Sequence, residues 1–116
     1  MLQVITANTI LYCAKWEETV AFYKDVLKLE IGFANDWFVE FNLNRCARLS
    51  VANEARASIK SSHGTGITIG LHVENIQTAH AYLTDAGGAP TKIKELWGSN
   101  VFYVHDPEGN RIEFWA

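Results

Sequence analysis

The stretch Asn100-Val-Phe-Tyr-Val-His-Asp-Pro-Glu-Gly-Asn-Arg-Ile-Glu-Phe-Trp115 predicts a β-hairpin near the end of this 116-residue chain. Residues 100–105 and 111–115 are rich in the apolar and aromatic residues that are typical of strands. The segment 106–110 between them carries Pro and Gly at positions that specify a tight turn. The pattern therefore predicts two antiparallel strands joined by a short, well-defined turn.

The hairpin completes a longer pattern that begins with a strand at 67–73. A helix at 76–86 follows, with Asn75 as its N-cap and the pair Gly87-Gly88 as its end. A further strand at 90–96 leads into the hairpin. The second half of the chain is thus predicted to contain one strand, one helix and then three strands.

The first half of the chain shows the same order of elements. An amphipathic helix at 16–28 is indicated by large apolar residues at helical spacing, namely Trp16, Val20, Tyr23 and Leu27. The flanking segments are apolar and separated by polar turns, which predicts strands at 4–13, 30–34, 37–43 and 47–52.

The two halves can be superposed as an internal repeat. The strands that precede the two helices end at Cys13 and Val73, an offset of 60 residues (73 − 13), and the same offset pairs Phe22 with Tyr82. One helix cannot cover both faces of a four-strand sheet, so two such units are expected to pack together. We predict an α+β fold of two tandem βαβββ modules, each with one helix. The chain is expected to form a single domain over 1–116, with module 1 at about 1–53, a linker at about 54–66 and module 2 at about 67–116.

Composition excludes several classes of partner. The net charge is −3 and Lys and Arg do not cluster, which argues against nucleic acid as a ligand. No apolar run is long enough to span a membrane, and no signal-peptide pattern is present, so a cytoplasmic protein is expected. Cys13 and Cys46 are expected to be buried thiols rather than a disulfide.

Two segments carry a resemblance to a known superfamily. Thr19-Val-Ala-Phe-Tyr-Lys-Asp-Val-Leu27 resembles the first-helix motif of the vicinal-oxygen-chelate superfamily, and Phe102-Tyr-Val-His-Asp-Pro-Glu-Gly-Asn-Arg-Ile-Glu-Phe114 resembles its last hairpin. This superfamily includes glyoxalase I, extradiol dioxygenases and bleomycin-resistance proteins. The resemblance implies that each module has a concave, mixed sheet and that the two form a cupped site, often in a homodimer.

Metal-dependent members of the superfamily place His, Glu or Gln ligands on the first and last strands of each half. The matching positions in this chain are Asn8, Ser50, Thr68 and Glu113. A catalytic divalent metal needs about three nitrogen or carboxylate ligands, and only Glu113 is a strong one. The resemblance therefore implies the architecture of the superfamily without its usual metal set, and no metal or other cofactor is expected.

Strand alternation assigns further residues to the cup. If Glu113 faces the cup, the candidate ligand-binding residues are aromatic with a few polar groups, the usual make-up of a small-molecule site. Trp37 and Trp97 lie next to turns and are candidates for its rim. The full set of candidates is Asn8, Tyr12, Trp37, Phe41, Arg48, Ser50, Thr68, His72, Trp97, Tyr103, His105, Arg111, Glu113 and Trp115.

Two plainer interpretations stay open for these residues. The aromatic side chains could be ordinary core, because large aromatics dominate protein interiors. Glu113 could be paired with Arg111, with Arg48 or with a tyrosine hydroxyl.

The sequence favours a metal-free small-molecule-binding protein that resembles the bleomycin-resistance proteins, which act by sequestration. Its ligand is expected to be aromatic or cationic, and its state a homodimer formed by edge pairing or by module exchange. No catalytic residue is predicted. The alternative is a metal-dependent enzyme of the glyoxalase or dioxygenase type with a displaced ligand set, Glu113 with His72 or His105. An accessory or regulatory module is a third possibility.

Overall fold

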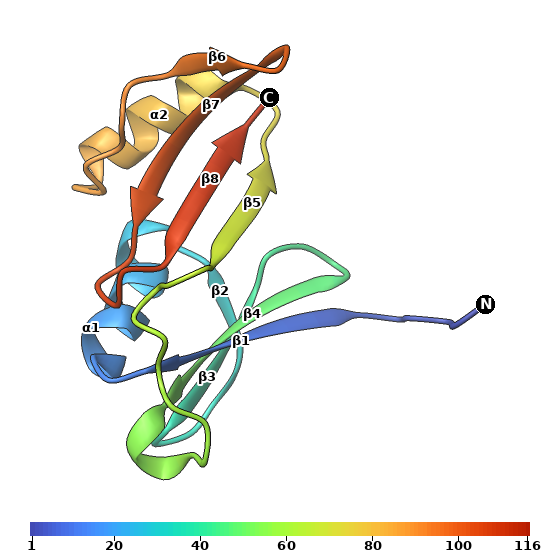
Figure 1. The fold of residues 1–116 in the computed structure, drawn as a ribbon, viewed down its shortest axis with the longest axis vertical. Helices are drawn as coiled ribbons and strands as arrows, with labels where there is room; N and C mark the ends of the chain where they lie inside the picture. The colour runs from blue at the N-terminus through green and yellow to red at the C-terminus, as the bar shows by residue number, and fades with distance from the viewer. The chain divides into compact units, whose positions relative to one another are not determined.

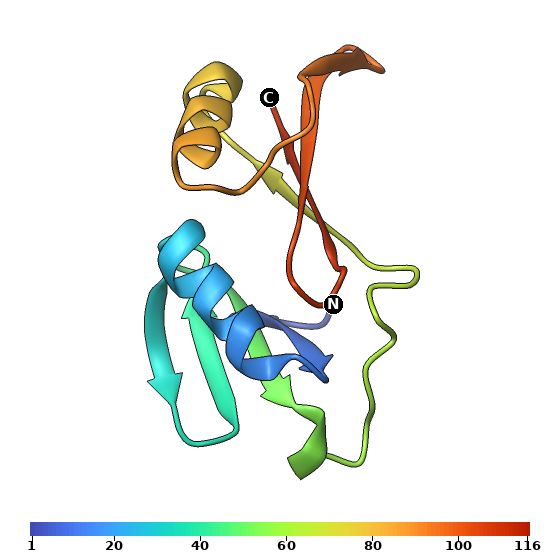
Figure 2. The same cartoon turned by 90° about the vertical axis from the view of Figure 1, so that its left-hand side faces the viewer.

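The computed structural model describes all 116 residues, which divide into two compact units. Unit 1 comprises Met1–Ser62 and unit 2 comprises His63–Ala116, and each is described by itself. Each unit contains one four-stranded sheet and one longer helical segment (Figures 1 and 2). The predicted α+β fold of two βαβββ modules is confirmed.

Unit 1 contains a mixed sheet in which the strand order is β1-β4-β3-β2. Strand β1 runs parallel to β4, and the other neighbours are antiparallel. The helix α1 is followed directly by the π-helical turns η1, and a short 3-10 helix, η2, follows the last strand. The elements are β1 (Ala7–Cys13), α1 (Trp16–Ala21), η1 (Phe22–Val26), β2 (Glu30–Ala34), β3 (Phe38–Asn42), β4 (Ala47–Asn53) and η2 (Glu54–Arg56).

Unit 2 repeats this arrangement with the strand order β5-β8-β7-β6. Strand β5 is parallel to β8, as β1 is to β4 in unit 1. The predicted N-cap is confirmed, because the Asn75 side chain accepts a hydrogen bond from the Thr78 amide. The elements are β5 (Thr68–His72), α2 (Ile76–Asp85), β6 (Lys94–Leu96), β7 (Ser99–His105) and β8 (Arg111–Trp115).

Three predicted elements are shorter by three or more residues in the structure. The strand predicted at 4–13 begins at Ala7, where its amide reaches the Cys46 carbonyl and pairing with β4 starts. The helix predicted at 16–28 is α-helical only to Ala21 and then widens into π-helical turns. The strand predicted at 90–96 begins at Lys94, because Pro90 has no amide to donate and Ala89 has a left-handed backbone.

The helical face of each sheet holds the core. In unit 1 the Tyr23 ring lies 5.9 Å from the Phe41 ring, and both side chains are buried. In unit 2 the His80 ring of α2 packs edge-on against Phe102, which stacks on Phe114. Figure 2 shows each helix lying over one face of its sheet. The opposite face, called the open face below, has no helix from its own unit.

The turn between β7 and β8 is built around one buried carboxylate. Asp106 Oδ1 accepts hydrogen bonds from the amides of Glu108 and Asn110, and its Oδ2 accepts one from the Asn110 side-chain amide. The three side chains are all buried. The predicted turn at 106–110 is confirmed. It fixes the register between β7 and β8, the strands on either side of it.

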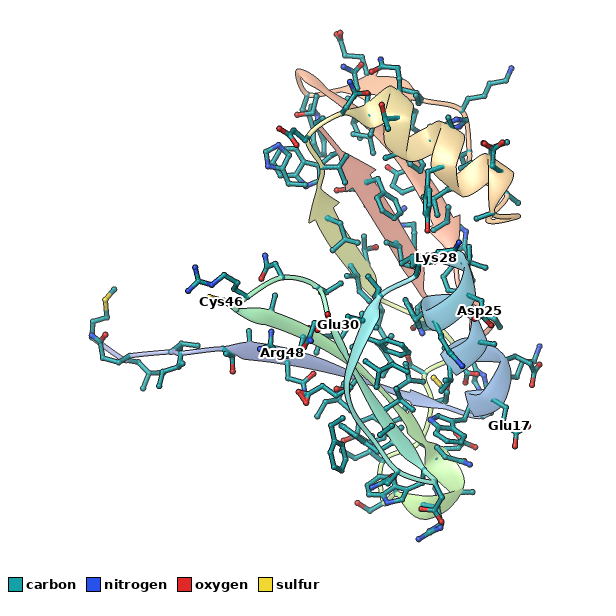
Figure 3. All side chains as sticks on the ribbon, turned by 180° about the vertical axis from the view of Figure 1, so that it is seen from behind. Glu17, Asp25, Lys28, Glu30, Cys46 and Arg48 are labelled. Atoms are coloured by element: carbon teal, nitrogen blue, oxygen red, sulfur yellow. The ribbon has the colours of Figure 1, made fainter.

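The cysteines do not form a disulfide. Cys13 is fully buried, as predicted, but the expectation of a buried thiol at Cys46 is wrong. Cys46 lies in the loop between β3 and β4, away from the helical segment that carries Glu17 and Asp25 (Figure 3).

Among the helices, none combines the length and the apolar character needed to cross a bilayer.

Candidate functional site

The open face of unit 1 is polar. Asn8 and Tyr12 of β1 lie on it together with Arg48 and Ser50 of β4, because paired residues in register share a face. The Ser50 hydroxyl, which is fully buried, donates a 2.8 Å hydrogen bond to Asn8 Oδ1. Two of the four positions that match metal ligands in the superfamily are therefore bonded to each other.

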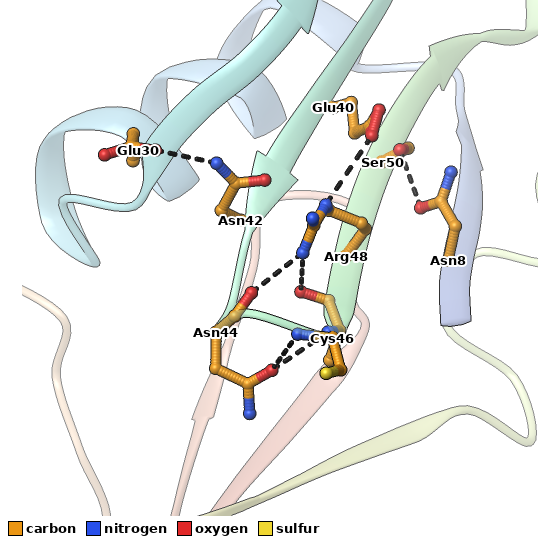
Figure 4. Close-up of polar contacts among 9 residues, drawn as sticks. Asn8, Glu30, Glu40, Asn42, Asn44, Cys46, Arg48 and Ser50 are labelled. Carbon is orange, nitrogen blue, oxygen red and sulfur yellow. Dashed lines mark hydrogen bonds and ion pairs between the residues drawn. The ribbon is translucent and has the colours of Figure 1, made fainter. Parts of the chain in front are cut away.

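Arg48 is held at the end of this face near the β3–β4 loop (Figure 4). Its Nη1 donates to the carbonyls of Asn44 (2.8 Å) and Ala47 (3.2 Å), and its Nε lies 3.9 Å from the Glu40 carboxylate. The side-chain amide of Asn42 donates to Glu30 on β2 at 2.7 Å. Side chains here line a polar pocket of ≈ 500 Å³, formed by Glu30, Asn42, Asn44, Arg45 and Arg48.

The predicted placement of Phe41 in the cup is wrong. Strand β3 pairs with β4 so that Glu40 faces Ser50 and Asn42 faces Arg48, which puts Phe41 on the helical face. The residues that sequence reasoning missed on the open face are Glu40 and Asn42. The alternation within β3 could have identified them, because its polar residues, Glu40 and Asn42, are two positions apart and therefore share a face.

Trp37 lies in the turn that precedes β3 and is half-buried, so β3 begins one residue later than the strand predicted at 37–43. Its ring packs edge-on against Phe38, with the ring centres 5.6 Å apart. The Trp37 carbonyl accepts a hydrogen bond from the Asn53 amide, which ties this turn to the end of β4.

The open face of unit 2 carries most of the predicted candidates. The register pairs Tyr103 with Glu113 and His105 with Arg111 across β7 and β8. Across β5 and β8 it pairs Thr68 with Arg111, and His72 with Trp115. The prediction that these side chains share one face is confirmed; their role in binding remains a prediction.

Arg111 is engaged on this face by two neighbours. Its Nε donates a 2.9 Å hydrogen bond to the Thr68 hydroxyl, and its guanidinium lies 4.6 Å from the centre of the Tyr103 ring. The ammonium of Lys94 lies 5.5 Å from the centre of the same ring. Both cations are therefore drawn toward the tyrosine, in contacts worth about 0.5–1 kcal/mol each at exposed sites.

Glu113 has no hydrogen bond or ion pair, although its side chain is half-buried. The pairings considered for it with Arg111 and with a tyrosine hydroxyl do not form in unit 2, because Arg111 is turned to Thr68. The nearest residue across β5 is Gly70, whose missing side chain leaves space beside the carboxylate.

A pocket of ≈ 290 Å³ lies next to Glu113. Its lining comes from the β6–β7 hairpin and from β8, and consists of Leu96, Trp97, Ser99, Val101, Glu113 and Trp115. Trp115 is stacked against His72 at 3.9 Å with an interplanar angle of 11°. The pocket is thus lined by one carboxylate and two indole rings, and the role of Trp97 as a rim residue remains a prediction.

The side chains present do not fit a catalytic divalent metal. No group of three or more His, Cys, Asp or Glu side chains is placed to hold an ion. Four positions match metal ligands in the superfamily. Asn8 and Ser50 are hydrogen-bonded to each other, and the Thr68 hydroxyl accepts a hydrogen bond from the Arg111 guanidinium. Glu113 is then the one carboxylate among the four. One carboxylate is fewer than the three protein ligands that such sites use.

Comparison with known structures shows the same fold in proteins of low sequence identity. A lactoylglutathione lyase from Agrobacterium tumefaciens aligns with a TM-score of 0.79 and 18% identity, covering 99% of this chain and 95% of that one. A glyoxalase/bleomycin resistance protein/dioxygenase from Nocardioides has a TM-score of 0.82 at 18% identity, covering 100% of this chain and 84% of that one. A member of the same superfamily from Sphaerobacter thermophilus is 22% identical, with a TM-score of 0.77 and coverage of 99% and 98%.

No curated protein matches this chain in sequence. The family model described as the glyoxalase/bleomycin resistance protein/dioxygenase superfamily matches residues 5–114, nearly the whole chain. With the two βαβββ units, this match establishes what the helix and hairpin motifs indicated: the chain belongs to the glyoxalase/bleomycin resistance protein/dioxygenase superfamily.

Proposed function

We propose that this protein binds a small organic molecule without a metal ion and acts by sequestration, like the bleomycin-resistance proteins it resembles. The observation that carries the proposal is the 2.9 Å hydrogen bond from Arg111 Nε to the Thr68 hydroxyl. It puts a positive charge beside a position that matches a metal ligand in the superfamily.

The charge at Arg111 works against a divalent cation at this place. Two positive charges a few ångströms apart repel each other, by about 1 kcal/mol per unit-charge pair at 4 Å even in bulk water and by more near a protein surface. A hydroxyl that accepts from a guanidinium is also a poorer donor of electron density to a metal. Thr68 is therefore better suited to orienting Arg111 than to ligating an ion.

The matching pair in unit 1 supports the same conclusion. Asn8 and Ser50 are uncharged, and the hydrogen bond between them satisfies the fully buried Ser50 hydroxyl. A metal at these atoms would gain only neutral oxygen ligands. Divalent transition metals prefer imidazole, thiolate and carboxylate donors.

What the open face of unit 2 offers instead is a binding surface. It combines the stacked rings of Trp115 and His72 with the cation–π pair of Arg111 and Tyr103. Rigid aromatic walls with a few fixed polar groups are typical of small-molecule sites. A superfamily enzyme with a displaced metal set would require His72 or His105 to join Glu113, and His72 is already stacked on Trp115.

Ligand binding in the presence of a chelator tests this proposal. Tryptophan fluorescence is titrated with aromatic and cationic drugs, beginning with metal-free bleomycin, in protein dialysed against EDTA and in protein supplied with Zn²⁺, Ni²⁺, Mn²⁺ or Fe²⁺. We expect the same affinity in both preparations. Binding that disappears on chelation and returns with one of the metals would show that the site needs an ion.

The homodimer expected from the resemblance remains a prediction, which the molar mass in solution would test. The segment before β1 supports it, because Leu2, Val4 and Ile5 are apolar and strongly exposed. Figure 1 shows this segment extending past the end of β1 without a partner strand in unit 1.

A further inference from the structure

The pocket beside Glu113 has an unusual distribution of charge. One carboxylate and two indole rings line it, together with Leu96, Ser99 and Val101. No Lys, Arg or His side chain belongs to the lining. The pocket is partly open and its volume of ≈ 290 Å³ is close to the lower end of the range, about 300 Å³, for small-molecule sites.

Trp97 is placed at this pocket by a turn that does not favour a tryptophan. Leu96 pairs with Ser99, so that Trp97 and Gly98 form a two-residue hairpin loop with φ values of 51° and 81°. Such loops prefer Asn, Asp or Gly, because the left-handed backbone crowds a bulky side chain. The Trp97 side chain is also 95% exposed, so burial does not compensate for the strain. Strained residues of this kind concentrate at ligand-binding sites.

Trp115 provides the second aromatic wall. The His72 ring covers one face of its indole at 3.9 Å, and His72 is not part of the pocket lining. Stacking restricts the rotation of the indole, and the surface that Trp115 turns to the pocket is a different one. A wall that is already ordered costs less entropy when a ligand binds.

Glu113 directs an unpaired negative charge into the same space. Two cations on the open face are engaged with other groups, since Arg111 donates to Thr68 and both Arg111 and Lys94 lie over the Tyr103 ring. A half-buried carboxylate without a partner gains more from an incoming cation than one that is already paired.

We propose that Glu113, Trp97 and Trp115 form a subsite for the ammonium head group of an organic cation. Aromatic faces and a carboxylate together attract an alkylated or primary ammonium, whereas a metal ion would find a single ligand here. The proposal rests on the proposed function, since it names the chemical class of ligand for one part of the same site.

A matched pair of probes tests the role of charge. Choline carries a trimethylammonium group, and 3,3-dimethylbutan-1-ol has the same shape with a carbon in place of the nitrogen. The binding is followed by the indole N–H signals in ¹H–¹⁵N NMR spectra, which number four for the four tryptophans. Trp16, whose indole N–H donates to the Val51 carbonyl, and Trp37 belong to unit 1 and serve as internal controls.

We expect choline to shift the signals of Trp97 and Trp115 and to leave those of Trp16 and Trp37 in place. The neutral alcohol should bind at least about tenfold more weakly, which corresponds to about 1.4 kcal/mol. Equal shifts with both probes would overturn the proposal, because the pocket would then recognise shape and not charge.

Two substitutions assign the effect to the residues. Glu113→Gln keeps the shape of the side chain and is expected to weaken choline binding about tenfold. Trp97→Ala should weaken it about fivefold through the lost cation–π contact. Glu95→Gln is the matched control, since it removes the same charge from an exposed position on β6 next to Leu96 and should leave the affinity unchanged.

The outcomes separate this inference from the proposed function. If Glu113→Gln binds choline as well as Glu95→Gln does, the ammonium subsite is wrong. Drug binding in the chelated protein would still support sequestration in that case. If neither choline nor any drug binds the chelated protein, both proposals fail.

Discussion

Gly64→Ala is expected to destabilise unit 2 by about 2–5 kcal/mol, far more than an ordinary glycine substitution. A Cβ at Gly64 would overlap the backbone carbonyl of Gly109 and would lie 2.9 Å from the Asn110 amide nitrogen. Gly64 also has φ of +80°, which an alanine adopts only at a cost. Both neighbouring atoms are backbone in the turn between β7 and β8, so the clash cannot be relieved by a side-chain rotation.

Gly66→Ala is the matched control for this experiment. Gly66 has a similar φ of +73°, but no atom lies within 4 Å of the position of a Cβ. The Gly66→Ala variant should lose only the free energy of unfolding that corresponds to the backbone strain, about 1–2 kcal/mol. Urea unfolding followed by circular dichroism gives both values. Equal losses for the two variants would show that the contact between Gly64 and the turn does not contribute.

This contact matters to the site as well as to stability. Gly64 packs against the turn that sets the register of β7 against β8. This register puts Tyr103, Arg111 and Glu113 on one face of the sheet. Residues 63–66 were predicted as part of a linker, whereas the structure includes them in unit 2. A polar, glycine-rich segment does not reveal from its composition that one glycine is packed against a distant turn.

Phe41→Ala is expected to lower the free energy of unfolding by about 3–5 kcal/mol, because it opens a cavity under the helix of unit 1. Phe41 is fully buried and contacts the buried Tyr23 ring. Phe33→Ala is the control, since Phe33 is on the neighbouring strand β2 and is 53% exposed. The control should cost about 1 kcal/mol or less.

The milder variant Phe41→Leu distinguishes a core residue from a ligand-binding one. It retains most of the buried volume and should fold, with ligand affinity equal to that of the natural chain. A loss of affinity in a folded Phe41→Leu protein would restore the original prediction that this ring faces the ligand. Fluorescence titration with the same drugs gives the comparison.

The residues of the open face were predicted better for unit 2 than for unit 1, because the residues of the turn between β7 and β8 specify its conformation strongly. Asp106 and the Pro and Gly of its turn specify the register of β7 and β8, so alternation along these two strands correctly grouped Tyr103 of β7 with Glu113 and Trp115 of β8. In β3, both parities contain aromatic residues, and the aromatic character of Phe41 was taken as the signal. Burial instead selected the parity that keeps Glu40 and Asn42 away from the helix.

The pocket beside Glu113 could not be predicted because it depends on backbone geometry. The strand predicted at 90–96 gave no indication that Trp97 and Gly98 form a two-residue loop. A Trp-Gly pair is an atypical sequence for such a loop, which usually contains Asn or Gly. The unpaired state of Glu113 depends on the hydrogen bond between Arg111 and Thr68, which lie 43 positions apart in the chain.

The metal content of the purified protein tests the central proposal most directly. Tag-free protein is incubated with Zn²⁺, Ni²⁺, Mn²⁺ and Fe²⁺, desalted and analysed by inductively coupled plasma mass spectrometry, alongside Glu113→Ala. We predict far less than one metal ion per chain in both proteins, because Asn8, Ser50 and Thr68 are bonded to other groups and Glu113 stands alone. One metal ion per chain in the natural protein, absent from Glu113→Ala, would contradict this account.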